Sequence, residues 1–337
     1  MTDQLSPAER YAASRRRSGH PVLELFRARQ RFEMDPFQLA ACAQLEDGKS
    51  VLVAAPTGAG KTIVAEFAIF QAMQGERGKV FYTAPMKALS NQKFQELVSE
   101  YGAESVGLLT GDTNINSQAR IVVMTTEVLR NMLYADSDLL RDLQCVVMDE
   151  VHFLADRFRG AVWEEVIIHL PQAVRMVSLS ATVSNAEEFG DWLQVVRGDT
   201  AVIVSEERPV PLDQHILMRT KLIDLFDSSG LAATHRVNPE LVQMARYGGR
   251  TLSARQMKDV GRYHSRGGRP ENQRMERAEV VRLLESKNLL PAIFFIFSRV
   301  GCDQAVSRVL RAGVRLTTVQ ERDEIRAIVE ERCRTLL

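Results

Sequence analysis

The residues best suited to chemistry lie in a stretch where an apolar run meets a glycine-rich turn and then a helical pattern, residues 51–73, VLVAAPTGAGKTIVAEFAIFQAM. Gly58 and Gly60 let the backbone curl so that successive N–H groups face one centre, and a following helix adds its positive dipole end. Lys61 is placed to reach the β- and γ-phosphates of a nucleotide, and Thr62 to offer a hydroxyl to Mg²⁺. The stretch predicts a phosphate-binding loop formed by Pro56, Thr57, Gly58, Ala59, Gly60, Lys61 and Thr62.

A second stretch, residues 145–152, CVVMDEVH, ends a short apolar strand in two carboxylates. Ligands of open α/β sheets bind at the carboxyl ends of the strands. Asp149 is placed there to hold Mg²⁺, and Glu150 to orient and deprotonate the water that attacks the γ-phosphate. Two acids at a strand end are also typical of a solvated helix cap. The phosphate loop upstream favours the catalytic interpretation, with Lys61, Asp149, Glu150 and His152 as catalytic candidates.

Composition limits the class of protein. The chain has 337 residues, 45% of them apolar, which predicts about two globular domains. Its formal net charge is zero, so any contact with nucleic acid must use a local surface. The four cysteines are scattered, and the apolar runs are too short to cross a membrane. We therefore expect a soluble cytoplasmic protein without a zinc or disulfide framework.

Continuous apolar segments alternate with helical patterns along the first two thirds of the chain. Such alternation is typical of a parallel sheet that is covered by helices on both faces. A helix is expected to begin at Asp35 and Pro36. The expected strands cover residues 80–84, 106–109, 121–125, 145–149, 176–180 and 201–204.

Changes of composition predict the domain boundaries. Residues 1–31 form a basic extension, interpreted as a solvated tail rather than a segment bound to an acidic partner. A nucleotide-binding domain follows over 32–205, and a proline-containing linker over 206–212. The second domain covers 213–337 and carries a mobile insertion near 246–274, whose excess of arginine fits either nucleic-acid binding or a solvated loop. Within it we expect loose strands over 213–226, a helix over 274–286 and a buried strand over 292–297.

A series of motifs resembles superfamily 2 helicases, and within them the DExH-box superkiller-type RNA helicases with their bacterial HelY-like members. Ala55 departs from the full phosphate-loop motif, which has glycine there. The resemblance implies a RecA-like first domain and an incomplete second RecA-like lobe, because the chain ends before any QxxGRxGR motif. An N-terminal fragment with little turnover of its own is expected. The motifs are APTGAGKT at 55–62, TAPMKALSNQK at 83–93, TGD at 110–112, TTEVLRNML at 125–133, DEVH at 149–152, SAT at 180–182 and FSR at 297–299.

The motifs also imply further site residues. Gln38 carries the donors and acceptor needed to read adenine, and Phe32 offers a face on which the base could stack. Ser180 and Thr182 are expected to bond toward His152 and Asp149 and so couple the nucleotide to nucleic-acid binding. Hydroxyls, backbone N–H groups and cations after the strands would bind a single strand. The implied nucleic-acid residues are Pro85, Lys87, Thr110, Gly111, Thr125, Glu127, Ser298 and Arg299.

The resulting hypothesis is an ATP-dependent RNA helicase that uses ATP and Mg²⁺ to move along single-stranded RNA and separate duplexes, in RNA processing or decay. A 3′ to 5′ direction is implied by the resemblance alone. The alternatives are a DNA helicase of the related repair branch and an ATP-gated nucleic-acid clamp that does not unwind. Expected partners are single-stranded RNA or DNA, the remainder of the protein's own chain and RNA-decay proteins, with no membrane.

Overall fold

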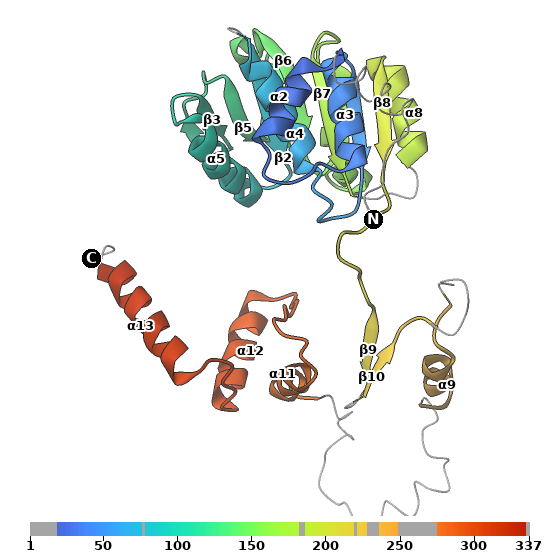
Figure 1. Cartoon of the computed structure of the whole chain (residues 1–337), viewed down its shortest axis with the longest axis vertical. Coiled ribbons are helices and arrows are strands. Elements are labelled where there is room, and N and C mark those ends of the chain that lie inside the picture. Colours follow the sequence, from blue (N-terminus) through green and yellow to red (C-terminus); the bar gives the residue numbers. More distant parts are fainter. Residues whose placement is uncertain are drawn as a thin grey trace, which may run out of the picture. The chain divides into compact units, whose positions relative to one another are not determined.

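A computed structural model describes the chain over residues 19–75, 78–181, 186–218, 221–227, 236–248 and 275–334. The chain forms two compact units, which divide between Pro211 and Leu212 (Figure 1). The first unit is built on one large sheet, whereas the second contains a small hairpin and several helices.

The sheet of the first unit has eight strands in the order β4-β3-β5-β2-β6-β7-β1-β8. Neighbouring strands are parallel, except that β4 runs antiparallel to β3 at one edge. The predicted RecA-like α/β fold is confirmed for this unit. The strands are β1 (Ser50–Ala54), β2 (Lys79–Ala84), β3 (Val106–Leu109), β4 (Asn114–Ile115), β5 (Ile121–Thr125), β6 (Leu143–Met148), β7 (Arg175–Ser180) and β8 (Thr200–Val204).

Alternate residues of the central strands enter two separate cores. Val51 and Val53 of β1 join one apolar cluster, whereas Leu52 between them joins the other. In β2, Tyr82 and Phe81 divide in the same way. Because successive strand side chains point to opposite faces, a sheet with a core on each side requires continuous apolar runs. This requirement explains why these strands carry so few polar residues.

Helices supply the other half of each core. The first cluster takes buried side chains from α2 (Pro21–Arg29), α3 (Pro36–Glu46), α4 (Thr62–Met73) and α5 (Lys87–Tyr101). These helices cover the face toward the viewer in Figure 1. The opposite cluster takes side chains from α6 (Thr126–Tyr134), the 3₁₀ helix η2 (Val151–Ala155), α7 (Gly160–His169) and α8 (Ala186–Arg197). A second 3₁₀ helix, η1 (Asp138–Leu140), precedes β6. No helix in the described ranges is long and apolar enough to span a membrane.

The basic N-terminal extension differs in part from its interpretation as a solvated tail. Residues 1–18 lie outside the described residues, but Pro21–Arg29 is helix α2. Leu23 and Phe26 of this helix are buried, and the Phe26 ring centroid lies 5.4 Å from that of Phe67 in α4. Arg27 and Arg29 of this helix are partly or fully exposed, and the described part of the first unit includes α2.

The second unit begins with an antiparallel hairpin of β9 (His215–Met218) and β10 (Lys221–Asp224), where the sequence predicts strands. Its helices are α9 (Pro239–Gly248), α11 (Arg277–Ser286), α12 (Arg299–Arg311) and α13 (Val319–Arg334). Residues 249–274, which hold most of the predicted insertion, lie outside the described residues.

The buried strand predicted over residues 292–297 is wrong. These residues form no strand, and Ile293, Phe295 and Phe297 are exposed. An apolar run becomes a buried strand only when neighbouring strands and helices cover it. In the described part of the second unit, nothing pairs with this run.

Candidate active site

The phosphate loop connects the end of β1 to the start of α4. Gly58 and Gly60 have φ angles of 87° and 80°, in the left-handed region that favours glycine. Gly60 is also held closely, because a Cβ added to it would lie 2.6 Å from Nε2 of Gln38. That nitrogen donates to the Gly60 carbonyl at 3.0 Å. The loop conformation is thus fixed partly by its glycines and partly by α3.

The side chain of Lys61 folds back onto the backbone of this loop. Its Nζ donates to the carbonyls of Ala55 at 2.8 Å and Pro56 at 3.0 Å. Burial lowers the pKa of Lys61, and the carboxylates of Glu150 and Asp149 oppose the shift. The lysine charge therefore sits between the loop and the two acids, where an anionic ligand would replace the carbonyls as its partner.

The two carboxylates follow β6, which lies two places from β1 in the sheet. Asp149 accepts a hydrogen bond from the Tyr82 hydroxyl at 2.7 Å and another from the backbone N–H of Glu150 at 2.9 Å. Glu150 has a φ angle of 53°, which is unusual for a residue other than glycine. Asp149 is thus oriented by hydrogen bonds, and Glu150 by its backbone conformation.

His152 lies between Glu150 and the end of β7. Its Nδ1 is 3.2 Å from Oε2 of Glu150 and 3.5 Å from the backbone nitrogen of Ala181. The two contacts exclude each other, because a protonated Nδ1 donates to the carboxylate and an unprotonated one accepts from the amide. The Ser180 hydroxyl, expected to make this contact, is buried without a hydrogen-bond partner among the described residues. Thr182 lies outside those residues.

The two residues predicted to bind adenine differ in burial. Gln38 is buried, and its amide oxygen accepts the backbone N–H of Asp35 at 2.9 Å, so the side chain braces α3 against the phosphate loop. Phe32 is 52% exposed. A cavity of about 730 Å³ adjoins the loop at Ala59, and the aromatic residue that lines it is Phe37. Its other lining residues are Asp35, Pro36, Ala40 and residues 203–209.

The predicted nucleic-acid residues of the first unit follow three adjacent strands. Pro85 and Lys87 come after β2, Thr110 and Gly111 after β3, and β5 ends at Thr125, two residues before Glu127 in α6. Because the order includes β3-β5-β2, these residues share one stretch of the carboxyl edge of the sheet. We call this stretch the β3-β5-β2 edge.

Polar contacts already join two of its loops. Lys87 Nζ lies 2.9 Å from Oδ2 of Asp112, whose other oxygen accepts the Thr110 hydroxyl at 2.9 Å. The hydrogen bonds from Lys87 and Thr110 lower the pKa of the Asp112 carboxyl. Ser298 and Arg299 belong instead to the second unit, where the Ser298 hydroxyl accepts the Gly301 N–H and caps α12.

Three residues near the site were missed by sequence reasoning. The apolar run around Tyr82 indicates only a buried strand, although a buried phenol requires a hydrogen-bond partner. The sequence around Phe37 indicates only the start of a helix. Arg159, which contacts Pro85 and Glu127, lies in a stretch that resembles the superkiller-type helicases, but no local signal gives its partners.

Residues 35–189 match the DEAD/DEAH box helicase family, and this range contains the phosphate loop, both carboxylates and the β3-β5-β2 edge. Residues 35–189 are therefore similar to the DEAD/DEAH box helicase domain.

Curated relatives narrow the resemblance. The chain is 54% identical over 317 residues to the probable helicase HelY of Mycobacterium leprae, covering 92% of this chain and 34% of that protein. It is 39% identical over 306 residues to the DExH-box ATP-dependent RNA helicase DExH15, chloroplastic, of Arabidopsis thaliana, covering 82% of this chain and 26% of that protein. The predicted resemblance to HelY-like DExH-box helicases is confirmed. The chain spans about a third of the length of the HelY relative.

A solved structure supports the fold. The DUF1998 helicase MrfA is similar with a TM-score of 0.54 at 19% identity, covering 90% of this chain and 43% of that one. At this identity the likeness concerns the fold alone. It agrees with the parallel sheet and its helical layers.

Proposed function

We propose that this chain carries the ATP-hydrolysing and nucleic-acid-binding machinery of an ATP-dependent RNA helicase. The observation that supports the proposal is that the nucleotide-site residues and the predicted nucleic-acid residues occupy different parts of one edge of the sheet. Phosphate-loop and carboxylate residues follow β1 and β6, whereas the predicted nucleic-acid residues follow β3, β5 and β2. Strands β2 and β6 are neighbours, so the two functions meet at one boundary.

The residues of the nucleotide half fit ATP and Mg²⁺. The left-handed glycines give a loop whose N–H groups can face phosphate, and Lys61 has only backbone carbonyls as hydrogen-bond acceptors within the described residues. Thr62 and Asp149 supply the hydroxyl and carboxylate oxygens that Mg²⁺ prefers. When bound, the ion would neutralise phosphate charge. A phosphate loop with a lysine, lying beside two carboxylates, is suited to binding a nucleotide together with Mg²⁺.

Each side chain then has a distinct part in hydrolysis. Lys61 would bind the β- and γ-phosphates, and Thr62 and Asp149 would hold Mg²⁺. Glu150 would orient the attacking water and accept its proton. His152, whose Nδ1 can bond either Glu150 or the backbone nitrogen of Ala181, would transmit a change at Glu150 to the end of β7.

RNA is the proposed substrate because a relative at 39% identity bears the name of an RNA helicase. Movement along single-stranded RNA, duplex separation and a role in RNA processing or decay, alongside RNA-decay proteins, complete the proposal. The nucleotide chemistry itself serves RNA and DNA equally, so substrate choice must be measured. Recognition of the 2′-hydroxyl is the chemical difference to test.

A cytoplasmic location is part of the proposal. Cys42 and Cys145 are buried and free, and Cys302 and Cys333 are exposed and free. Unpaired cysteines suit a reducing compartment.

Two substitutions test the nucleotide half. Lys61→Ala should weaken ATP binding about 10- to 100-fold, because it removes a charge-assisted contact to phosphate. Glu150→Gln keeps the shape of the side chain and leaves Asp149 in place, so it should bind ATP like the parent and hydrolyse it far more slowly. Nucleotide affinity measured by fluorescence titration, beside steady-state hydrolysis, separates the two results. Parental affinity in Lys61→Ala would contradict the site assignment.

The substrate is tested on the complete protein with matched RNA and DNA duplexes that carry single-stranded tails. An RNA helicase should show greater hydrolysis with single-stranded RNA than with DNA of the same sequence, and should separate the RNA duplex with ATP. Preference for DNA would favour the DNA helicase alternative. Nucleic-acid binding that depends on ATP without strand separation would favour the clamp.

A further inference from the structure

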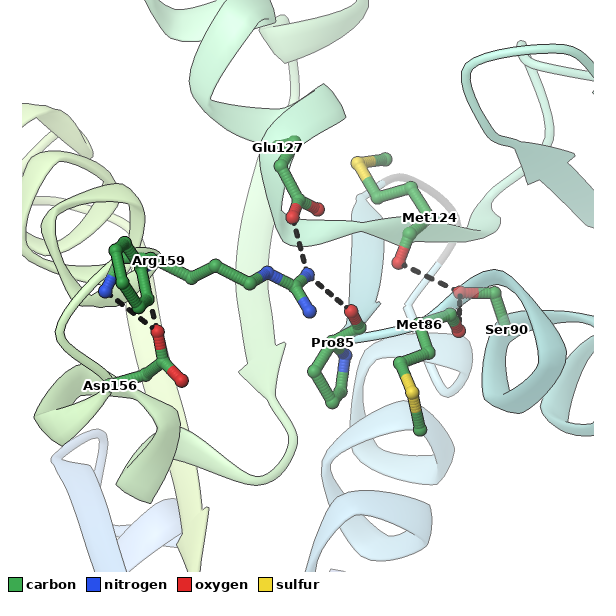
Figure 2. A network of polar contacts seen from close by, with 8 residues as sticks. Pro85, Met86, Ser90, Met124, Glu127, Asp156 and Arg159 are labelled. Carbon is green, nitrogen blue, oxygen red and sulfur yellow. Dashed lines mark hydrogen bonds and ion pairs between the residues drawn. The ribbon is translucent and has the colours of Figure 1, made fainter. Parts of the chain in front are cut away.

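A single arginine joins two segments of the β3-β5-β2 edge, those that follow β2 and β5. Nη2 of Arg159, in the loop before α7, donates to the Pro85 carbonyl and to the Glu127 carboxylate (Figure 2). Pro85 follows β2 and Glu127 lies in the first turn of α6, so one guanidinium connects the segments that follow two adjacent strands, β2 and β5. A planar guanidinium is suited to such a role because its donors have fixed directions.

The arginine is itself held firmly. Oδ1 of Asp156 accepts the backbone N–H groups of Phe158 at 2.9 Å and Arg159 at 2.8 Å, which fixes the turn. The guanidinium carbon lies 5.6 Å from the centroid of the buried Trp163 ring, within the range of a cation–π contact. The side chain is thus fixed at its backbone and at its charged end.

The Pro85 loop is also tied from the other side. The Ser90 hydroxyl in α5 is buried, and it lies 3.3 Å from the Met86 carbonyl and 3.4 Å from the Met124 carbonyl at the end of β5 (Figure 2). Arg159 and Ser90 therefore connect the same two strand ends. Loss of the arginine would leave the buried serine contact in place, so the loop would loosen without the sheet unfolding.

A continuous series of contacts leads from Arg159 back to the nucleotide half. The Trp163 ring stacks on Phe153 in η2 with centroids 5.8 Å apart, and Phe153 lies 5.3 Å from the His152 ring. His152 contacts Glu150. The segment after β6 therefore touches the attacking-water residue at one end and the β3-β5-β2 edge at the other.

From this arrangement we propose that Arg159 is a positioning residue that holds Pro85 and Glu127 in the conformation that binds a nucleic-acid strand. The proposal rests on the proposed function, because it concerns the same binding edge. Arg159 acts through Pro85 and Glu127 and does not bind phosphate itself. It links strand binding to the segment that carries the catalytic acids.

Binding of a fluorescent single-stranded RNA oligonucleotide to the complete protein tests this role. Arg159→Ala should raise the Kd about tenfold, because two charge-assisted hydrogen bonds that hold the edge are lost. Arg157→Ala is the matched control. Arg157 is exposed in the same loop and makes no ion pair or side-chain hydrogen bond recorded among the described residues, so its loss should change the Kd less than twofold.

Salt dependence separates positioning from direct phosphate contact. If Arg159 acts through its neighbours, Arg159→Ala should keep the parental slope of log Kd against log salt. A direct phosphate contact would reduce that slope by about 0.7. Glu127→Gln should weaken binding less in the Arg159→Ala background than in the parent, since the pair acts as a unit.

If Arg159→Ala does not fold, Arg159→Lys decides, because it keeps the charge but loses the planar guanidinium that gives the two Nη2 hydrogens fixed directions. The Kd of Arg159→Lys for the RNA oligonucleotide should rise about threefold. A parental Kd in the folded variant, an equal loss in Arg157→Ala, or the smaller salt slope would each overturn the proposal. Failure of the parent to bind any oligonucleotide would instead refute the proposed function, and this inference with it.

Discussion

Tyr82 shows how a buried strand residue acts on chemistry at the end of a neighbouring strand. Its ring belongs to the core of one sheet face, whereas its hydroxyl reaches Asp149 after β6. Burial and the Asp149 carboxylate raise the pKa of this phenol well above its usual value, so it remains a donor at any physiological pH. The carboxylate predicted to hold Mg²⁺ is thus oriented by a residue outside every recognisable motif.

Tyr82→Phe should therefore disturb metal binding while nucleotide contacts with Lys61 remain. We expect the Mg²⁺ concentration for half-maximal hydrolysis to rise about tenfold, the lower end of the usual effect of removing a partner of a metal ligand. The measurement is a Mg²⁺ titration of hydrolysis at saturating ATP. Tyr134→Phe, which removes a hydroxyl from an exposed ring beside His169, should leave the titration unchanged. Identical curves for all three proteins would refute the role of Tyr82.

Residue types in motifs could be predicted from the sequence, but their partners could not. Lys61 and Asp149 are predictable because the phosphate loop and the paired acids are local patterns. Arg159 lies 74 residues from Pro85 and 32 from Glu127, so only the fold brings them together. Gln38 carries the groups expected for adenine, yet it uses its amide oxygen and Nε2 to brace α3 and the phosphate loop.

At the scale of elements, the parallel sheet brings segments that are distant in the sequence together at the carboxyl ends of its strands. The strands expected over 106–109 and 121–125 coincide with β3 and β5, because periodicity and length are strong in runs buried on both faces. The strand expected over 292–297 failed because a run of apolar residues does not reveal whether neighbours exist to cover it. The two-residue β4 carries too few positions for any pattern.

The junction between η2 and α7 depends on one glycine. A Cβ at Gly160 would lie 2.1 Å from the Leu154 carbonyl oxygen, and backbone cannot move aside as a side chain can. Gly160→Ala should destabilise the first unit by about 1–3 kcal/mol. Gly111→Ala, whose Cβ would meet nothing within 4 Å, should change stability by less than about 0.5 kcal/mol.

Urea unfolding followed by tryptophan fluorescence measures this difference in the 337-residue chain. Its two tryptophans, Trp163 and Trp192, both lie in the first unit, so the signal reports on that unit. Equal urea midpoints of unfolding for Gly160→Ala and Gly111→Ala would show that the turn before α7 can relax. Such a result would argue against a fixed position for the Arg159 side chain.

For the whole molecule, the division into units places the nucleotide site and the β3-β5-β2 edge together in the first unit. Every nucleotide-site residue described above lies before Pro211, and so does the β3-β5-β2 edge. Both apolar cores of the large sheet are complete within this unit. A protein of residues 19–211 should therefore fold by itself, with Cys42 and Cys145 protected from thiol reagents. Burial raises the pKa of Cys145 to about 11 and keeps its reactive thiolate scarce.

The same fragment should bind ATP with Mg²⁺ but hydrolyse it slowly. Contacts of the phosphate loop exist in the ground state, so its affinity for nucleotide should lie within about threefold of that of the complete protein. Charge that develops during phosphoryl transfer needs a further cation, which the helicase resemblance assigns to the second lobe, and such an arginine is worth about 10³ to 10⁵ in rate. RNA-stimulated hydrolysis should fall by at least about 10³-fold. The measurement compares both proteins, with Lys61→Ala in the fragment as the control for specific binding. Equal hydrolysis by the fragment and the complete protein would show that a cation of the first unit already completes the site. Arg159, which contacts the β3-β5-β2 edge next to the nucleotide site, would then be the first residue to substitute.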